Sequence, residues 1–176
     1  MKTRTEKKED YETITQVNNK AFERKEEGIL INELRKRREY KSELSLVAIK
    51  KNKIVGHLLL FPIFIETNSS RIKTLSLGPI AVLPEYQKQG VGKSLVKEGI
   101  EKAIKHGFKS IVVIGHPKYY PKFGFKRATN YKVKMPKKYE NKIDNPNAFM
   151  ILKLEKNSLK NIEGTLVFPE EFDDAM

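Results

Sequence analysis

The stretch "LGPIAVLPEYQKQGVGKSLV", residues 77 to 96, runs from an apolar segment through a glycine-bearing loop into an amphipathic pattern. A loop of this kind between a strand and a helix presents backbone N–H groups and the positive end of the helix dipole to an anion, usually a phosphate. Gly90 and Gly92 leave space for phosphate oxygens to approach the amides. The stretch therefore predicts a phosphate-binding loop at the start of a helix.

Two familiar phosphate-binding motifs do not fit this loop. A Walker loop, G-x-x-x-x-G-K-[ST], would have its first glycine at position 87, where the chain has Gln87. The next apolar run, "SIVVIGH", also ends without an aspartate to hold magnesium. The dinucleotide motif G-x-G-x-x-G fails because its third glycine is replaced by Leu95. The sequence therefore favours neither magnesium-ATP nor a dinucleotide as the ligand.

The segments on both sides of the loop predict a strand, a helix and a second strand. Apolar and charged residues recur at helical spacing from Gly90 to His106, and Gly107 follows as a C-terminal cap. The apolar runs Leu75 to Val82 and Ile111 to Ile114 are predicted to be parallel strands, the second covered on both faces. The pair Gly78 and Pro79 predicts a bulge in the first of them.

The rest of the chain predicts further elements of the same kinds. Asp10 to Phe22 and Ile29 to Arg38 have the spacing of two amphipathic helices. Leu44 to Ile49 and Ile54 to Ile65 read as a hairpin around a charged turn, and Ala148 to Leu154 as another strand.

Composition predicts one domain, residues 1–176, in the cytoplasm. A chain of 176 residues with 39% hydrophobic content can bury a single core. Charged residues recur throughout the first ten positions, with no apolar segment among them, and the longest apolar stretch, Leu58 to Ile65, is too short to cross a bilayer. With no cysteines, and with His57, His106 and His116 far apart in the sequence, we expect no metal site.

A net charge of +13 raises nucleic acid as a partner. The basic residues are mostly lysines scattered along the chain, whereas a nucleic-acid groove would interleave arginines with stacking aromatics. The densest cluster, Arg35 to Arg38, is interpreted as a solvated helical face because Glu33 and Glu39 flank it. Nucleic-acid binding is kept as the less favoured alternative.

What does fit the loop is Gln-x-x-Gly-x-Gly, Gln87 to Gly92, after "LGPIAVLPEY". This pattern resembles the pyrophosphate loop [RQ]-x-x-G-x-[GA] of the GNAT superfamily of acyl-CoA-dependent N-acetyltransferases. The stretch "ELSLVAIKKNKIVGHLLLFPI" is similar to the paired strands of that superfamily, and "YYPKFGF" and "GTLVFPEEF" are similar to a subfamily of small predicted N-acetyltransferases. The resemblance implies an α/β fold with a mixed, mostly antiparallel sheet flanked by helices and a splayed central pair of parallel strands.

The resemblance also implies which residues bind acetyl-CoA. The pantetheine arm would pair with the first splayed strand, and the pyrophosphate would bind the loop. The predicted cofactor residues are Ile80, Ala81, Val82, Gln87, Lys88, Gln89, Gly90, Val91, Gly92 and Lys93.

Tyr120 occupies the place of the family's proton donor, four positions before the glycine of the Gly124–Phe125 pair. It would protonate the departing CoA thiolate, and ordinary pKa values of about 8.5 for the thiol and about 10 for the phenol make this transfer slightly unfavourable. Tyr119 beside it is interpreted as a core residue.

The reaction implied is direct attack of a primary amine on the thioester of acetyl-CoA. The general base stays open among Glu66, His57 and His116. A noncatalytic acyl-CoA-binding module is the main alternative, and acetyl transfer to an amine panel separates the two. The sequence does not name the amine acceptor, and a monomer or a homodimer is compatible with it.

Overall fold

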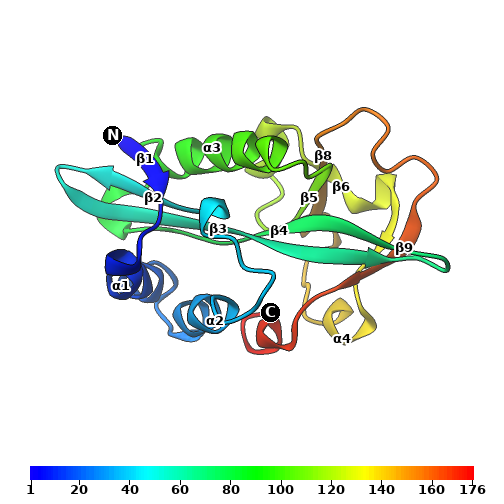
Figure 1. The fold of residues 1–176 in the computed structure, drawn as a ribbon, viewed down its shortest axis with the longest axis horizontal. Helices are drawn as coiled ribbons and strands as arrows, with labels where there is room; N and C mark the ends of the chain where they lie inside the picture. Colours follow the sequence, from blue (N-terminus) through cyan, green and yellow to red (C-terminus); the bar gives the residue numbers. More distant parts are fainter.

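The computed structural model describes residues 1–176 and contains one nine-stranded sheet with strand order β1-β2-β3-β4-β5-β8-β6, to which β9 and β7 are added at the edge of β3 (Figure 1). The strands are β1 (Lys2–Thr5), β2 (Ser45–Lys50), β3 (Lys53–Glu66), β4 (Arg71–Val82), β5 (Ser110–Ile114), β6 (Lys126–Arg127), β7 (Lys132–Lys134), β8 (Phe149–Lys153) and β9 (Glu163–Val167). The helices are α1 (Tyr11–Phe22), α2 (Glu26–Leu34), α3 (Val91–Lys105) and α4 (Lys137–Glu140), and short 3₁₀ turns include Tyr120–Phe123 and Glu170–Asp174. None of the helices has the length and apolar character needed to span a membrane.

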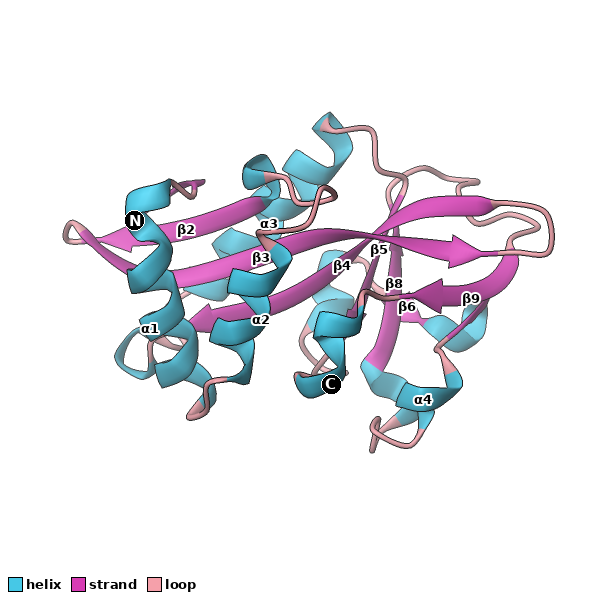
Figure 2. Ribbon diagram, turned by 60° about the horizontal axis from the view of Figure 1, so that its bottom comes forward, coloured by secondary structure: helices cyan, strands magenta, loops and turns pink.

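Helices cover both faces of the sheet. Figures 1 and 2 show α3 on one face and α1, α2, α4 and the C-terminal 3₁₀ turn on the other. Alternate residues of β3 enter two separate hydrophobic clusters, because successive side chains of a strand point to opposite faces. Leu59 and Phe61 belong to the cluster under α1 and α2, whereas Leu58 and Leu60 belong to the cluster under α3. The sheet therefore has a buried core on each side.

The two central parallel strands pair over a short length only. Leu75 of β4 faces Ile111 of β5, and Ser76 faces Val112, and no pairing continues beyond these residues. On the other edge of β4 the register with β3 shifts between Leu58 and Leu60, next to Gly78, whose φ is +146°. The bulge predicted from the Gly78–Pro79 pair is confirmed, and the last residues of β4 separate from β5.

The structure confirms the predicted hairpin, the helix after the loop, the second parallel strand and the mixed α/β fold class. Gly107 follows α3 with a φ of +76°, as expected of a helix cap. The interpretation of Arg35 to Arg38 as a solvated helical face is wrong for the helix and for Arg35, because α2 ends at Leu34 and the Arg35 side chain is only 6% exposed. The side chains of Lys36 and Arg38 are exposed, as expected. Arg35 is buried because it pairs with Glu6, a partner distant in the sequence.

Candidate active site

The loop between β4 and α3 is shaped by its own glutamines. The side-chain amide of Gln87 donates a hydrogen bond to the backbone oxygen of Val82 at 3.1 Å, which ties the loop to the end of β4. The side-chain oxygen of Gln89 accepts a hydrogen bond of 2.7 Å from Lys50, the last residue of β2. The loop is therefore held in place from both sides before any ligand binds.

The glycines of this loop have different structural roles. Gly90 has a φ of +84°, a left-handed conformation that side chains disfavour, although a Cβ there would meet no atom within 4 Å. At Gly92 a Cβ would lie 2.9 Å from the hydroxyl of Tyr119. No side chain caps the N-terminus of α3, so the amides of its first turn are available to an anion.

A cleft of about 470 Å³ opens in front of this loop, and we call it the loop cleft. It contains every predicted cofactor residue except Ala81, which is buried in the sheet, and Gln89. Its positive charge comes from three lysines, Lys88, Lys93 and Lys122. Its remaining lining residues, which the sequence did not single out for the cofactor, are Tyr86, His116, Tyr119 and Tyr120. The loop cleft thus combines free amides, cations and aromatic rings, which suits a phosphate-bearing ligand.

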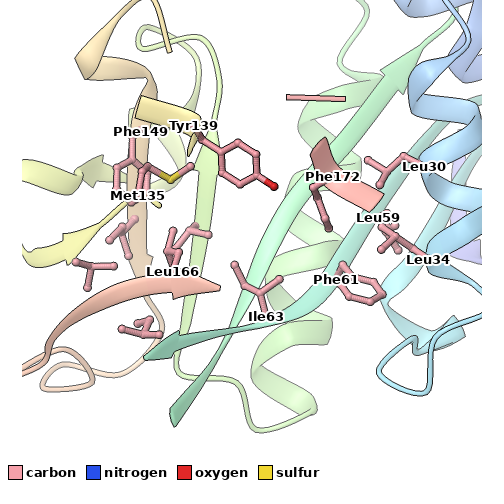
Figure 3. Close-up of a cluster of buried hydrophobic side chains, with 14 of the residues drawn as sticks. Leu30, Leu34, Leu59, Phe61, Ile63, Met135, Tyr139, Phe149, Leu166 and Phe172 are labelled. Atoms are coloured by element: carbon pink, nitrogen blue, oxygen red, sulfur yellow. The ribbon is translucent and has the colours of Figure 1, made fainter. Parts of the chain in front are cut away.

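A second cleft, of about 380 Å³, lies on the α1–α2 side of the sheet, and we call it the apolar cleft. Hydrophobic residues make up 15 of the 21 that line it, and Arg24 and Glu27 are its only charged residues. Figure 3 shows Met135, Phe149 and Leu166 on one side of this region and Leu30 and Phe172 on the other. These side chains come from segments far apart in the sequence, and no local pattern identified them.

The two clefts meet at Ile80 and Tyr120, which line both. The Tyr120 residue is only 6% exposed, and its ring packs edge-to-face on Phe125 at 5.6 Å between centroids. Gly115 leaves room for this ring, since a Cβ there would lie 2.3 Å from it. Burial, with a smaller effect from Tyr119, raises the pKa of Tyr120, so its hydroxyl stays protonated at neutral pH. A hydrogen-bond donor therefore stands where the two clefts join.

The structure separates the three candidates for a general base. His116 lines the loop cleft and is exposed. Glu66 lies at the far end of β3, pairs with Arg71 at 3.2 Å and lines neither cleft. His57 is fully buried and also lines neither. Of the three, only His116 is near the junction.

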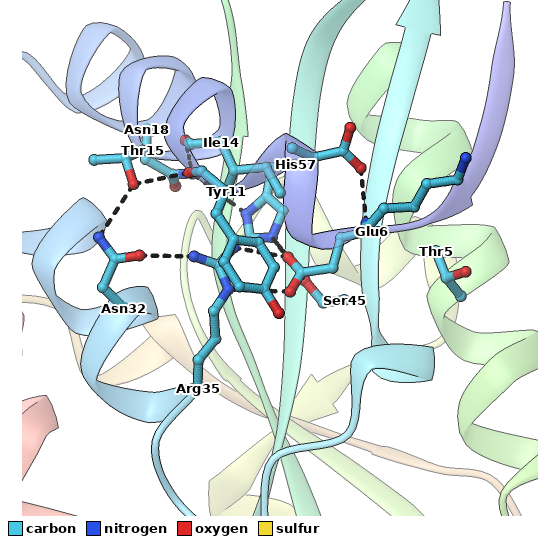
Figure 4. A network of polar contacts seen from close by, with 12 residues as sticks. Thr5, Glu6, Tyr11, Ile14, Thr15, Asn18, Asn32, Arg35, Ser45 and His57 are labelled. Atoms are coloured by element: carbon cyan, nitrogen blue, oxygen red, sulfur yellow. Dashed lines mark hydrogen bonds and ion pairs between the residues drawn. The ribbon is translucent and has the colours of Figure 1, made fainter.

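His57 belongs to a buried polar network that sequence reasoning did not find (Figure 4). Arg35 donates two hydrogen bonds to Glu6, at 3.0 and 2.8 Å. Burial alone would raise the pKa of Glu6, but its polar neighbours outweigh burial and lower the pKa to about 2: His57 lies 3.7 Å away, and Arg35, Ser45 and Tyr40 donate hydrogen bonds to the carboxylate. Glu6 is therefore charged at neutral pH even though its side chain is 0% exposed.

The hydrogen bonds of the network fix the tautomer of His57. Asn18 donates to Nδ1 of His57 at 3.3 Å, so Nδ1 is an acceptor and Nε2 has the proton. Nε2 lies 2.9 Å from Oγ of Ser45, which in turn donates to Glu6 at 2.6 Å. Burial lowers the pKa of His57, in agreement with a neutral ring. His57 is thus a structural residue of the core.

No group of three or more histidine, aspartate and glutamate side chains is placed to hold a metal ion.

Comparison with known proteins identifies the class. The model of the acetyltransferase (GNAT) domain matches residues 2–128, so the chain belongs to the GNAT acetyltransferase family, whose cosubstrate is acetyl-CoA.

Relatives of the chain have the same family assignment. This chain is 36% identical over 118 residues to the uncharacterized N-acetyltransferase YjhQ of Escherichia coli. The match covers 67% of this chain and 65% of YjhQ, so it spans just under two thirds of the length of YjhQ. The chain is 25% identical over 157 residues to the uncharacterized N-acetyltransferase YhbS of the same organism, which covers 88% of this chain and 87% of YhbS.

Solved structures show the same fold. The crystal structure of E. coli YhbS in complex with CoA has a TM-score of 0.86 at 24% identity and covers 98% of this chain and 91% of that one. A GNAT family acetyltransferase from Brucella melitensis in complex with acetyl-CoA has a TM-score of 0.76 at 26% identity and covers 98% of this chain and 97% of that one.

Proposed function

We propose that residues 1–176 act as a single acyltransferase domain that moves the acetyl group of acetyl-CoA to a primary amine. The observation that carries this proposal is the meeting of the loop cleft and the apolar cleft at Ile80 and Tyr120. One cleft suits a phosphate-bearing donor, the other suits a separate acceptor, and a reaction between two substrates needs such a junction.

In this proposal acetyl-CoA binds the loop cleft. Its pyrophosphate contacts the amides of the first turn of α3 and the loop from Gln87 to Lys93, with Lys88 and Lys93 as counter-charges. The pantetheine arm lies between the separated ends of β4 and β5 and takes backbone groups of residues 80 to 82. The thioester then stands beside Tyr120.

The amine reacts from the apolar cleft. A lysine-like amine is neutral in only about one molecule in 2,500 at pH 7, so the ammonium must first lose a proton to water or to a base. The nitrogen then attacks the thioester carbon, and an amide of β4 near Ile80 or Val82 stabilises the oxyanion. The C–S bond breaks as the C–N bond is completed, the attacking nitrogen loses its further proton to water or to a base, and the Tyr120 hydroxyl donates to the departing thiolate.

A thermal-shift titration tests the donor site. A ligand that binds only the folded state adds about 2.7 kcal/mol of stability at 100 times its dissociation constant, so acetyl-CoA and CoA should raise Tm clearly. Stabilisation by magnesium-ATP with no response to CoA would reject the assignment. Binding of acetyl-CoA without transfer to any amine would identify a noncatalytic acyl-CoA-binding module instead. Salt-dependent binding of DNA or RNA that acetyl-CoA does not alter would favour the nucleic-acid alternative.

A further inference from the structure

We propose that the apolar cleft selects acceptors with one primary amine on an aliphatic or aromatic body. The inference rests on the acetyl-transfer function proposed above and names the acceptor class for it. It follows from the charge, the lining and the rigidity of this cleft.

The charges of the apolar cleft do not suit a polycation. Glu27 is its only acidic side chain, and it is 4% exposed. Both oxygens of its carboxylate accept hydrogen bonds from Arg24, the only basic side chain in the lining, so the pair has no net charge. Cations in an apolar site require carboxylate partners of their own. A polyamine or an aminoglycoside would bring several ammonium groups with no free carboxylate to meet them, so the cleft disfavours such acceptors.

The walls of the apolar cleft suit a hydrocarbon body. Leu30, Met135, Phe149 and Phe172 face the cavity and are each at most 9% exposed. At its edge Phe22, the last residue of α1, remains 37% exposed, although large apolar side chains are normally covered. An acceptor with an apolar body would cover Phe22 and remove its own hydrocarbon surface from water.

The C-terminal wall of the cleft is fixed before any acceptor binds. Phe172 packs on Phe61 with ring centroids 6.2 Å apart. The turn that contains it is tied to the body by two ion pairs, Lys138 with Asp173 at 2.6 Å and Arg37 with Glu171 at 3.0 Å. A preformed cleft of about 380 Å³ is in the size range of small-molecule sites.

Much of this wall lies outside the region that defines the family. Met135, Phe149, Leu166 and Phe172 all follow residues 2–128, which are matched by the family model. Acceptor preference is therefore set here by residues that family membership does not describe.

The first experiment uses a series of primary n-alkylamines from ethylamine to hexylamine, whose ammonium groups have nearly equal pKa values. If the body of the acceptor enters the apolar cleft, kcat/KM should rise about fourfold per methylene, which corresponds to about 0.8 kcal/mol each. Phenethylamine should be accepted, and spermidine and kanamycin should be poor acceptors. If kcat/KM does not change with alkyl chain length, or if the polycations are the better acceptors, the inference is overturned while the acetyl-transfer function stands.

A binding measurement keeps the inference testable without turnover. The N-alkylacetamides are the products of the same series, and their Kd for the CoA complex should fall with chain length. Equal Kd values for N-ethylacetamide and N-hexylacetamide would refute the apolar acceptor site. Failure of CoA itself to bind would instead count against the function proposed above.

Two variants test the residues. Phe22→Ser should lower kcat/KM for hexylamine by about fourfold or more, the effect of about one methylene. Ile104→Ser is the matched control, since Ile104 is 54% exposed on α3 and lines neither cleft, and it should leave the rate unchanged.

Discussion

Replacing Tyr120 by phenylalanine removes the one hydroxyl that lines both clefts. The ring should keep its contacts with Phe125 and Tyr119, whose centroids lie 5.6 and 5.1 Å from it. We therefore expect Tyr120→Phe to fold with nearly unchanged stability and to bind acetyl-CoA with nearly unchanged affinity. The loss should appear in kcat.

The environment of Tyr120 sets the size of this loss. Ordinary pKa values place the phenol about 1.5 units above the thiol, and burial raises the pKa of Tyr120 further. Complete proton transfer to the thiolate is therefore less favourable than the sequence alone suggested, and a hydrogen bond to the developing charge is the main contribution. A hydrogen bond to a charged group contributes about 1.5 to 3 kcal/mol, so kcat should fall about tenfold to about 150-fold.

Release of the CoA thiol provides the assay, with the best alkylamine as acceptor. The protein has no cysteines, so a thiol reagent reports only free CoA. Tyr119→Phe is the matched control, because Tyr119 lines the loop cleft and not the apolar cleft, and its kcat should change much less. Near-parental rates for Tyr120→Phe, or a larger loss for Tyr119→Phe, would refute the role given to Tyr120.

Two further predictions concern the loop and the buried network. Gly92→Val should raise the Kd of CoA about tenfold or more by blocking the amides of α3. The Tm without ligand should change little, since the closest atom to a Cβ there is the hydroxyl at the end of the Tyr119 side chain, and Val82 and Ile80 lie at ordinary contact distance. An unchanged Kd in calorimetry would contradict the loop assignment. Glu6 has a pKa of about 2 in the fold against an ordinary 4.5, so its contribution of about 3 kcal/mol is present above pH 4.5 and is lost as the pH falls toward 2. Urea unfolding measured at several pH values in this range should show that the free energy of unfolding falls with pH in the parent and falls less in Glu6→Gln. If the two proteins lost stability equally with falling pH, Glu6 would not be the cause.

Local patterns made the donor side of the protein predictable. The glycine loop, the helix after it and the bulge at Gly78 and Pro79 each depend on residues that are neighbours in the sequence, and each is found in the structure. The loop cleft also contains most of the residues expected from the family resemblance, although their binding roles stay predictions.

The apolar cleft was not predictable for a physical reason. Phe22, Glu27, Met135 and Phe172 come together only through the tertiary fold, and none stands in a motif. Short strands were missed for the same reason, since β1 and β9 owe their existence to distant partners: Thr3 of β1 faces Ala48, for example. Arg35 was misplaced because a sequence cannot reveal that Glu6 neutralises it.

The buried network also has a consequence for the cofactor strand. His57 of β3 lies opposite Ala81 of β4. Ala81 stands between Ile80 and Val82, whose backbone groups are proposed to contact the pantetheine arm. A shift of β3 by one residue would turn His57 to the α3 face, away from Ser45 and Asn18, and leave buried polar groups without partners. Only one pairing register of β3 satisfies the hydrogen bonds of the network. The network therefore fixes where β4, paired with β3, presents Ile80 and Val82. A charged network that lines neither cleft thereby positions the strand on which the proposed chemistry depends.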